Sequence, residues 1–325
     1  MQKLVSADLC KYDARPHEEN IAAIKRFKEQ ENALLLCHTY QRPEVHEVAD
    51  FVGDSYGLSV QATKAAQSTI VFCGVHFMAE TAKILNPQKR VLLPSLDAGC
   101  GLADAIDVEG VRAWKARYPG LPMVLYINSP ADVKAEADII CTSGNTLKAI
   151  EAAQGNRVLL APDKNLYYSF ADKTSKELIP WEGYCPVHKA VTGDMVEYAM
   201  AEHPSALVVV HPECNPDVTE LADAVLSTSG MVEYVRESAE REFIIGTELG
   251  LVQLLERTFP DKEFYQVYDH KSCDESCVCP YMKAITLGKV RRSLEQGTHE
   301  IMVPEDIRVK AMTALERMIA IGRDR

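Results

Sequence analysis

Three loops that follow strand-like runs carry cysteines, and thiolates from separate loops can together hold a metal centre. Cys100 lies between glycines in DAGCGLAD, and Cys185 follows in EGYCPVH. A third group, Cys273, Cys277 and Cys279, comes later in CDESCVCP. Zinc sites usually show two close cysteine pairs, a pattern that this sequence lacks, whereas thiolates are the normal ligands of iron–sulfur clusters. The arrangement therefore favours an iron–sulfur cluster with three cysteine ligands and one open iron.

The remaining cysteines suggest packing rather than chemistry, because cysteine often behaves as a small buried hydrophobic residue. Cys37, Cys73 and Cys141 lie inside or at the end of apolar, strand-like runs. Cys10 and Cys214 are interpreted in the same way, although Cys214 is next to Glu213.

A second set of polar side chains follows three apolar runs that are predicted to be buried strands. These residues are His38, Tyr40, Tyr126, Asn128, His211 and Glu213. Glu213 is the single carboxylate among them, so it is the candidate general base, with Tyr40 as its partner. His188, three positions after Cys185, is a further candidate for the pocket.

The three runs belong to a repeat. Ala-Asp pairs end at Asp50, Asp138 and Asp223, and the strand-end residues recur with the same two steps along the chain. The step from Cys100 to Cys185 equals the step from Asp138 to Asp223.

A hydroxyl residue stands five positions after each of these aspartates, namely Ser55, Ser143 and Thr228. A hydroxyl at the start of a helix can cap it and, with the unpaired N–H groups, bind a carboxylate or phosphate. Three such positions predict a small substrate with several negative charges.

Strands that alternate with helices predict parallel sheets with crossover helices, in which ligands bind beyond the carboxyl ends of the strands. We therefore expect an α/β protein of three homologous αβα (Rossmann-like) sandwich domains around a pseudo-threefold axis with a central active site. The predicted domains are residues 1–117, residues 118–203, and residues 204–325, the last with an amphipathic C-terminal helix.

Charge and hydropathy argue against several partners. The chain has 35 Lys and Arg against 47 Asp and Glu, a formal net charge of −12, and no basic run. This balance disfavours a nucleic-acid or membrane surface as a partner. No apolar stretch approaches the roughly 18 residues of a membrane-spanning helix, and the N-terminus does not resemble a signal peptide. We expect a cytoplasmic protein.

Together the motifs resemble the quinolinate synthase family, in order from about position 32 to position 290. The motifs are HTYQ, GDS, DAGCGLAD, YINSPA, CTS, PDKNL, EGYCPVH, HPEC, STS, GTE and CPYMKAITL. The resemblance implies condensation of iminoaspartate with dihydroxyacetone phosphate to give quinolinate, phosphate and water in de novo NAD biosynthesis. It also implies an L-aspartate oxidase or aspartate dehydrogenase as a possible supplier of iminoaspartate.

The resemblance further implies a [4Fe-4S] cluster that acts as a Lewis acid and is held by Cys100, Cys185 and Cys279. Tyr40 and Glu213 match the family's proton-transfer pair, and His188 matches a histidine near the cluster. The implied substrate-binding residues are His38, Ser55, Tyr126, Asn128, Ser143, His211, Glu213 and Thr228.

Some features leave alternatives open. Strict periodicity would favour Cys273 as the third ligand, because its step from Cys185 equals that from Asp50 to Asp138. The family's ligand instead precedes Pro-x-Met, which is Cys279 here.

Departures from the family pattern are few: Leu226 and Tyr167 stand where the family often has glycine, and Tyr56 stands where it usually has leucine. Two other functions fit the same pattern of cysteines and polar residues. One is an iron–sulfur sensor that binds a small acid without turnover, and the other is a zinc-dependent hydrolase or lyase.

Overall fold

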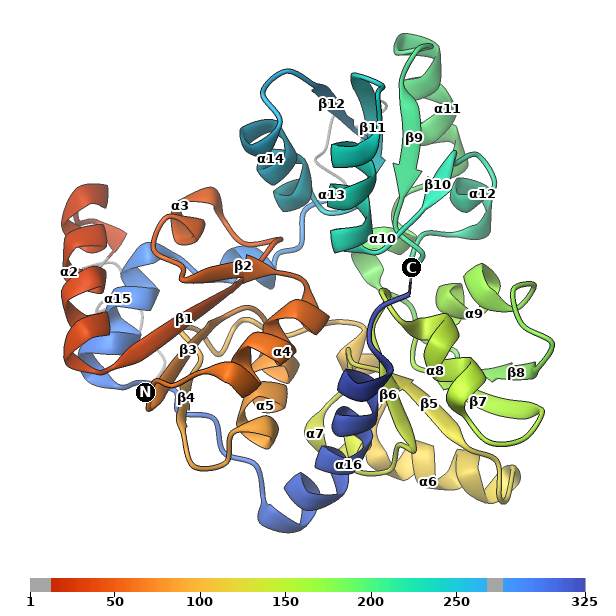
Figure 1. Ribbon diagram of the computed structural model, residues 1–325, viewed down its shortest axis with the longest axis horizontal. Helices are drawn as coiled ribbons and strands as arrows, with labels where there is room; N and C mark the ends of the chain where they lie inside the picture. The colour runs from red at the N-terminus through yellow and green to blue at the C-terminus, as the bar shows by residue number, and fades with distance from the viewer. Residues whose placement is uncertain (1–12, 268–276, 325) are drawn as a thin grey trace. The chain divides into compact units, whose positions relative to one another are not determined.

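The computed structural model describes residues 13–267 and 277–324, so Cys10 and Cys273 lie outside the described residues. The chain divides into two compact units. The first comprises the described part of Met1–Cys100 together with Pro280–Glu305. The second comprises the described parts of Gly101–Cys279 and Asp306–Arg325. Figure 1 shows the elements of both units by label.

The first unit is built on a parallel four-stranded sheet with the order β2-β1-β3-β4. Its central strands are apolar and buried, as expected for a sheet with helices on both faces. The strands are β1 (Ala33–His38), β2 (Phe51–Gly53), β3 (Thr69–Cys73) and β4 (Arg90–Leu92). The helices are α2 (His17–Gln30), α3 (Pro43–His46), α4 (Ser55–Lys64), α5 (His76–Leu85), η2 (Met282–Ala284) and α15 (Leu287–Gln296).

The second unit contains two further parallel sheets, with the orders β6-β5-β7-β8 and β10-β9-β11-β12. The first of these has β5 (Met123–Tyr126), β6 (Ile139–Cys141), β7 (Arg157–Ala161) and β8 (Glu177–Pro180). The second has β9 (Leu207–Val210), β10 (Ala224–Val225), β11 (Glu242–Gly246) and β12 (Glu263–Gln266). All three sheets thus have one strand order, and the predicted α/β class with three sandwich-type sheets is confirmed.

The second unit also contains the following helices. They are η1 (Ala103–Ala105), α6 (Val108–Arg117), α7 (Ala131–Lys134), α8 (Thr146–Ala152), α9 (Lys164–Phe170) and α10 (Pro186–Lys189). They continue with α11 (Gly193–Glu202), α12 (Pro216–Thr219), α13 (Thr228–Glu237), α14 (Leu249–Thr258) and α16 (Glu305–Ile321).

The repeated aspartates explain why the three sheets share a register. Asp50, Asp138 and Asp223 each accept a hydrogen bond at 2.8 Å from a backbone N–H fifteen positions earlier, in the first half of a central strand. Each aspartate also donates its own N–H to the carbonyl of that residue, at 2.9–3.1 Å. The aspartate therefore fixes where the short edge strand starts, in all three repeats.

Two apolar clusters form the cores of the second unit. One joins Val111 of α6 to Met123 and Leu125 of β5, so α6 packs on the second sheet rather than the first. The other gathers Val208 and Val210 of β9 with residues of the flanking helices.

In the first unit, α15 packs along α2, where Arg291 hydrogen-bonds Glu19 and Asn20. A segment from late in the chain thus covers the first sheet. The predicted domain boundaries stay a prediction.

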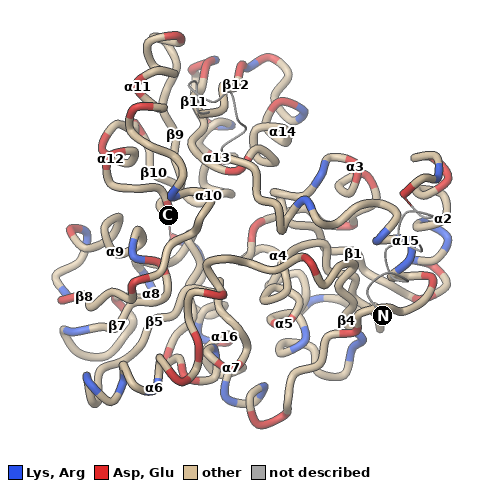
Figure 2. The backbone as a smooth tube through the Cα atoms, turned by 180° about the vertical axis from the view of Figure 1, so that it is seen from behind, with Lys and Arg blue, Asp and Glu red and all other residues tan. Residues whose placement is uncertain are grey.

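Charged residues of both signs are interspersed along both units (Figure 2), in line with the net charge of −12. Within residues 13–267 and 277–324, no helix combines the length and the apolar composition needed to span a bilayer.

Candidate active site

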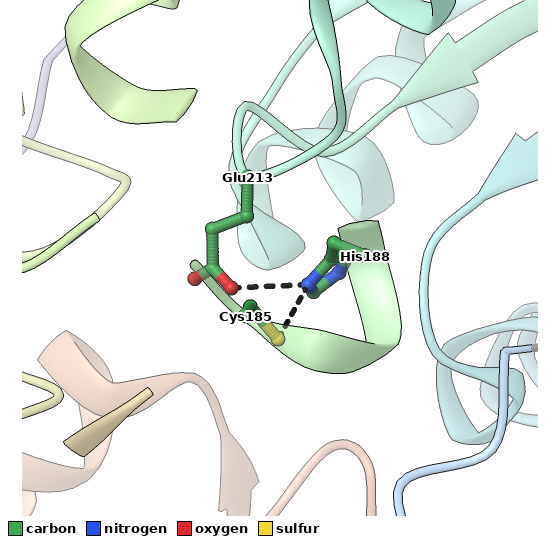
Figure 3. A group of neighbouring side chains, drawn as sticks. All are labelled: Cys185, His188 and Glu213. Carbon is green, nitrogen blue, oxygen red and sulfur yellow. Dashed lines mark hydrogen bonds and ion pairs between the residues drawn. The ribbon is translucent and has the colours of Figure 1, made fainter. Parts of the chain in front are cut away.

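Glu213 is the centre of a buried polar cluster in the second unit. It follows β9 in the segment His211–Asn215 and is 3% exposed. His188, on the short helix α10, lies with its Nδ1 atom 3.0 Å from Glu213 Oε2 and 3.3 Å from the Cys185 sulfur. Figure 3 shows the imidazole facing both partners. The Nε2 atom of the same ring lies 2.9 Å from Thr247 Oγ1, so both ring nitrogens are engaged.

The second oxygen of Glu213 is held from the neighbouring sheet. Tyr126, the last residue of β5, donates its hydroxyl to Glu213 Oε1 at 2.5 Å, and Ser143 hydrogen-bonds the same tyrosine side chain. Asn128, two positions further, has its Oδ1 atom buried without a hydrogen-bond partner among residues 13–267 and 277–324. Since buried acceptors are almost always satisfied, an unpaired oxygen beside this cluster is suited to receive a donor from a ligand.

The charges of the cluster are set by burial and by these contacts. Burial alone would raise the pKa of Glu213, but its electrostatic interactions with the His188 and His211 rings and the hydrogen bonds from His188 and Tyr126 lower it to about 2. Burial, and then the Glu213 charge, raises the pKa of Tyr126 well above its ordinary value. The same two causes raise the pKa of Asp163, against three backbone hydrogen bonds that lower it. The cluster thus contains an ionised Glu213 and a phenol that keeps its proton.

His211 stacks on His188 with ring centroids 4.6 Å apart and an interplanar angle of 20°. Its Nδ1 atom accepts the backbone N–H of Glu213 at 3.3 Å. The first unit contains the same local turn: His38 Nδ1 accepts the N–H of Tyr40 at 3.1 Å, and the two rings meet edge to face at 4.7 Å. The histidine therefore orients the residue two positions later in both repeats.

Burial separates the cysteines into two groups. Five described cysteines are buried: Cys37, Cys73, Cys141, Cys214 and Cys277. Burial raises the pKa of Cys37, Cys73 and Cys214, and that of Cys141 to about 12. These four thiols stay protonated, which suits packing rather than metal binding.

The other three described cysteines, Cys100, Cys185 and Cys279, are partly exposed. Thiolates in this number suit an iron–sulfur cluster, so the donor set fits that cofactor. A second possible donor set lies within the second unit, because ligand atoms of Cys185, His188 and Glu213 lie within 4.8 Å of one another.

The backbone places these three cysteines in equivalent positions. In each repeat, the backbone N–H of the first residue of a helix (α5, α9 or α14) donates a hydrogen bond of 2.7–2.9 Å to a backbone carbonyl. This carbonyl belongs to the residue two positions before the cysteine of that repeat. The pairs are His76–Ala98, Lys164–Gly183 and Leu249–Cys277. Cys279 therefore occupies in the third repeat the position of Cys100 and Cys185, which supports the Pro-x-Met assignment over Cys273. The ligand roles themselves stay predictions.

Four residues that contact Glu213, His188 or the partly exposed cysteines were not identified as functional candidates from the sequence. Asp163 and Glu248 accept the backbone N–H groups of Cys185 and Cys279, while Asn165 donates to the Glu213 carbonyl and Thr247 pairs with His188.

The repeat could have indicated the two carboxylates, Asp163 and Glu248, as equivalent positions. Their separation in sequence equals that between Asp138 and Asp223. Lys164, the next residue after Asp163, instead forms an ion pair with Glu182 at 2.7 Å. The motif PDKN therefore contributes its aspartate and asparagine to the cluster, and its lysine to the surface.

Two of the three hydroxyl residues, Ser55 and Thr228, open their helices but do not cap them as expected. Asp54 accepts the Gly57 N–H and caps α4, and Ser227 accepts the Gly230 N–H and caps α13. Ser55 and Thr228 come one position later, as the first helical residues.

The structure brings only part of the predicted site together within one unit. Ser143 lies before α8 and near Tyr126, and these two residues join His188 and the His211–Glu213 segment in the second unit. His38, Tyr40, Ser55 and Cys100 belong to the first unit.

Comparison with known proteins matches residues 22–320 to the family described as quinolinate synthetase A protein. The chain is similar to the quinolinate synthase of Thermodesulfovibrio yellowstonii, with 48% identity over 302 residues that cover 93% of this chain and 98% of the relative. The quinolinate synthase of Geobacter metallireducens is 49% identical over 301 residues, 93% of this chain and 97% of the relative. Quinolinate synthase 1 of Methanosarcina acetivorans is 46% identical over 301 residues, with the same coverage.

Proposed function

Because the chain belongs to the quinolinate synthase family, we propose that it condenses iminoaspartate with dihydroxyacetone phosphate to quinolinate, phosphate and water in de novo NAD biosynthesis. The observation that carries this proposal is the buried Glu213 carboxylate, which accepts from Tyr126 and pairs with His188 beside Cys185. A condensation followed by dehydration needs groups that take up and return protons at fixed positions, and this cluster provides them.

Cys100, Cys185 and Cys279 are the proposed ligands of a [4Fe-4S] cluster with one open iron. Their partial exposure and equivalent backbone positions support that assignment. When bound, such a cluster supplies a Lewis acid that polarises a substrate oxygen or nitrogen.

Glu213 and Tyr40 are proposed as the proton-transfer pair of the reaction, with His188 as a third catalytic residue. The lowered pKa of Glu213 keeps its carboxylate negative, so it can stabilise a positive charge on His188 after the ring accepts a proton. Tyr126 holds the carboxylate from the other side and thereby fixes the direction of the His188 ring. Proton movement at a buried pair of this kind avoids exchange with bulk water.

Substrate binding is proposed for a further set of polar side chains. The hydroxyls of Ser55, Ser143 and Thr228 are proposed to hold the anionic groups, and charge-assisted hydrogen bonds contribute about 1.5–3 kcal/mol each. The unpaired Oδ1 of Asn128 can accept an N–H or O–H of the substrate. Further contacts are proposed for the substrate from His38, Tyr126, His211 and Glu213.

The setting of this activity is also part of the proposal. Iminoaspartate would come from an L-aspartate oxidase or an aspartate dehydrogenase, because an amino acid must lose two electrons to become an imine. We place the reaction in the cytoplasm, with small-molecule substrates and without nucleic-acid or membrane partners.

The test is a Glu213→Gln variant purified with its cluster intact and assayed for quinolinate. Loss of a positioned proton-transfer group should lower the rate by about 10²–10⁴-fold. The matched control is Glu202→Gln, because Glu202 also accepts a tyrosine hydroxyl, from Tyr198 at 3.0 Å, but on the surface of α11. Near-normal quinolinate formation by Glu213→Gln would exclude the proposed role.

One observation favours a second candidate, a single-metal hydrolase or lyase. The donor atoms of Cys185, His188 and Glu213 lie within 4.8 Å of one another, a set that could hold one zinc ion. The iron, sulfide and zinc content of anaerobically purified protein separates the two, since about four irons per chain supports the cluster and stoichiometric zinc supports the alternative. An iron–sulfur sensor of the same fold would carry the cluster but form no quinolinate.

A further inference from the structure

Asp163 makes more contacts than the cap of a short helix requires. It precedes α9, is fully buried, and accepts the N–H groups of Asn165 and Leu166 at Oδ1, at 2.7 and 3.3 Å. Its other oxygen, Oδ2, accepts the backbone N–H of Cys185 at 3.3 Å. One buried carboxylate therefore joins the start of a helix to the loop that carries a proposed ligand.

Glu248 shows the same arrangement in the third repeat. It precedes α14, is 1% exposed, and accepts the N–H of Gly250 with Oε2 at 2.6 Å. Its Oε1 atom accepts the backbone N–H of Cys279 at 3.1 Å. An aspartate and a glutamate thus perform the same task in the second and third repeats. Val75 takes the corresponding position in the first repeat, and its side chain has no acceptor.

The same two segments also hold Glu213 and His188. Asn165, two positions after Asp163, donates to the Glu213 carbonyl at 2.8 Å. Thr247, one position before Glu248, lies 2.9 Å from His188 Nε2. The Asp163 segment therefore contacts both Cys185 and Glu213. The Glu248 segment in the same way contacts both Cys279 and His188.

We propose that Asp163 and Glu248 are positioning residues that fix the Cys185 and Cys279 loops relative to the Glu213–His188 pair. This inference rests on the proposed function, in which those two cysteines hold the cluster. A buried carboxylate with both oxygens bonded to backbone N–H groups cannot turn without leaving buried donors unpaired. The two loops therefore keep one position relative to α9 and α14, which orients the thiolates before the cluster is bound.

The test uses Asp163→Asn and Glu248→Gln in the full-length protein purified anaerobically. An amide has one acceptor and one donor end, so each variant must give up either the helix contact or the cysteine N–H. Outer groups that orient metal ligands typically change metal affinity by about 10–100-fold. We expect iron loss to a ferrous chelator to be faster by that factor, and the electron paramagnetic resonance signal of the reduced cluster to change.

The matched control is Asp107→Asn. Asp107 caps α6 by accepting the Gly110 N–H at 2.7 Å, and it is exposed. It therefore shares the capping role and lacks the link to a cysteine loop. The control should retain the wild-type rate of iron loss and the wild-type spectrum.

A second measurement tests the hydrogen bonds themselves and does not depend on the cluster. Hydrogen exchange at the Cys185 amide should become about tenfold faster in Asp163→Asn, and at the Cys279 amide in Glu248→Gln. Unchanged exchange, or wild-type iron retention in both variants, would overturn the proposal. If wild-type protein carries no iron–sulfur cluster, the proposed cofactor fails, whereas the exchange rates still decide whether the carboxylates position the loops.

Discussion

Replacing Tyr126 by phenylalanine removes one hydroxyl from a fully buried contact of 2.5 Å with Glu213. A hydrogen bond to a charged group contributes about 1.5–3 kcal/mol, and about 1.4 kcal/mol corresponds to one pKa unit. The pKa of Glu213 should therefore rise from about 2 by about 1–2 units. The free energy of unfolding at neutral pH should fall by about 1.5–3 kcal/mol.

The pH dependence of this loss follows from the direction of the shift. The folded-state pKa of Glu213 lies below its ordinary value of 4.5, so the carboxylate stabilises the folded protein above that pH. This stabilisation is lost as the pH falls from 4.5 towards about 2. Because the substitution raises only the folded-state pKa, the difference between wild type and variant should be constant near neutral pH and should narrow below about pH 4.

Urea denaturation of both proteins across this pH range measures the difference directly. The control is Tyr198→Phe, whose hydroxyl donates to Glu202 at 3.0 Å on the surface, and surface substitutions usually change stability by less than about 0.5 kcal/mol. A loss for Tyr126→Phe that is as small as the control, or that stays constant down to about pH 3, would refute the electrostatic account of Glu213.

Three further predictions concern the cysteines, the repeat and the substrate. Cys279→Ser should abolish iron binding, while Cys273→Ser should retain it. Iron analysis of the two purified variants measures this, and the reverse result would show that the third ligand is misassigned. Asp138→Ala should lower the unfolding free energy by about 1–2 kcal/mol, and Asp138→Asn should lose less because its amide oxygen can still accept the Met123 N–H. Equal losses in the two variants, measured by denaturation, would contradict this. Asn128→Ala should raise KM for substrate by about tenfold with little loss of stability, because Oδ1 has no partner within the described part of the chain. An unchanged KM would exclude substrate contact.

The sequence determined the fold to a large extent, because each repeat encodes its sheet through local patterns. Runs such as 33–37, 123–127 and 206–210 are apolar, and the structure confirms strands there. The short edge strands β2 and β10 were not predicted, since two or three residues carry too little pattern. Their position is set by Asp50 and Asp223, which bond a backbone group fifteen positions earlier.

The candidate residues of the site also followed from the motifs and the repeat. The sequence alone, however, left Cys273 and Cys279 as alternatives for the third cluster ligand. The tertiary structure supports Cys279, because the carbonyl two positions earlier accepts the N–H of Leu249, as Gly183 does for Lys164. Loop lengths differ between repeats, so counting residues cannot replace this backbone contact. The ligand role itself awaits the iron analysis.

Only the tertiary structure decided which of these side chains meet. Tyr126 reaches Glu213 from another sheet, 87 residues away in sequence, and His188 reaches it across 25 residues. Likewise, Asp163 and Glu248 lie at helix starts, and only the folded chain shows that one oxygen of each accepts the backbone N–H of Cys185 or Cys279. The physical reason is that side-chain periodicity specifies which face of an element is buried, whereas contacts between polar groups depend on how the elements pack.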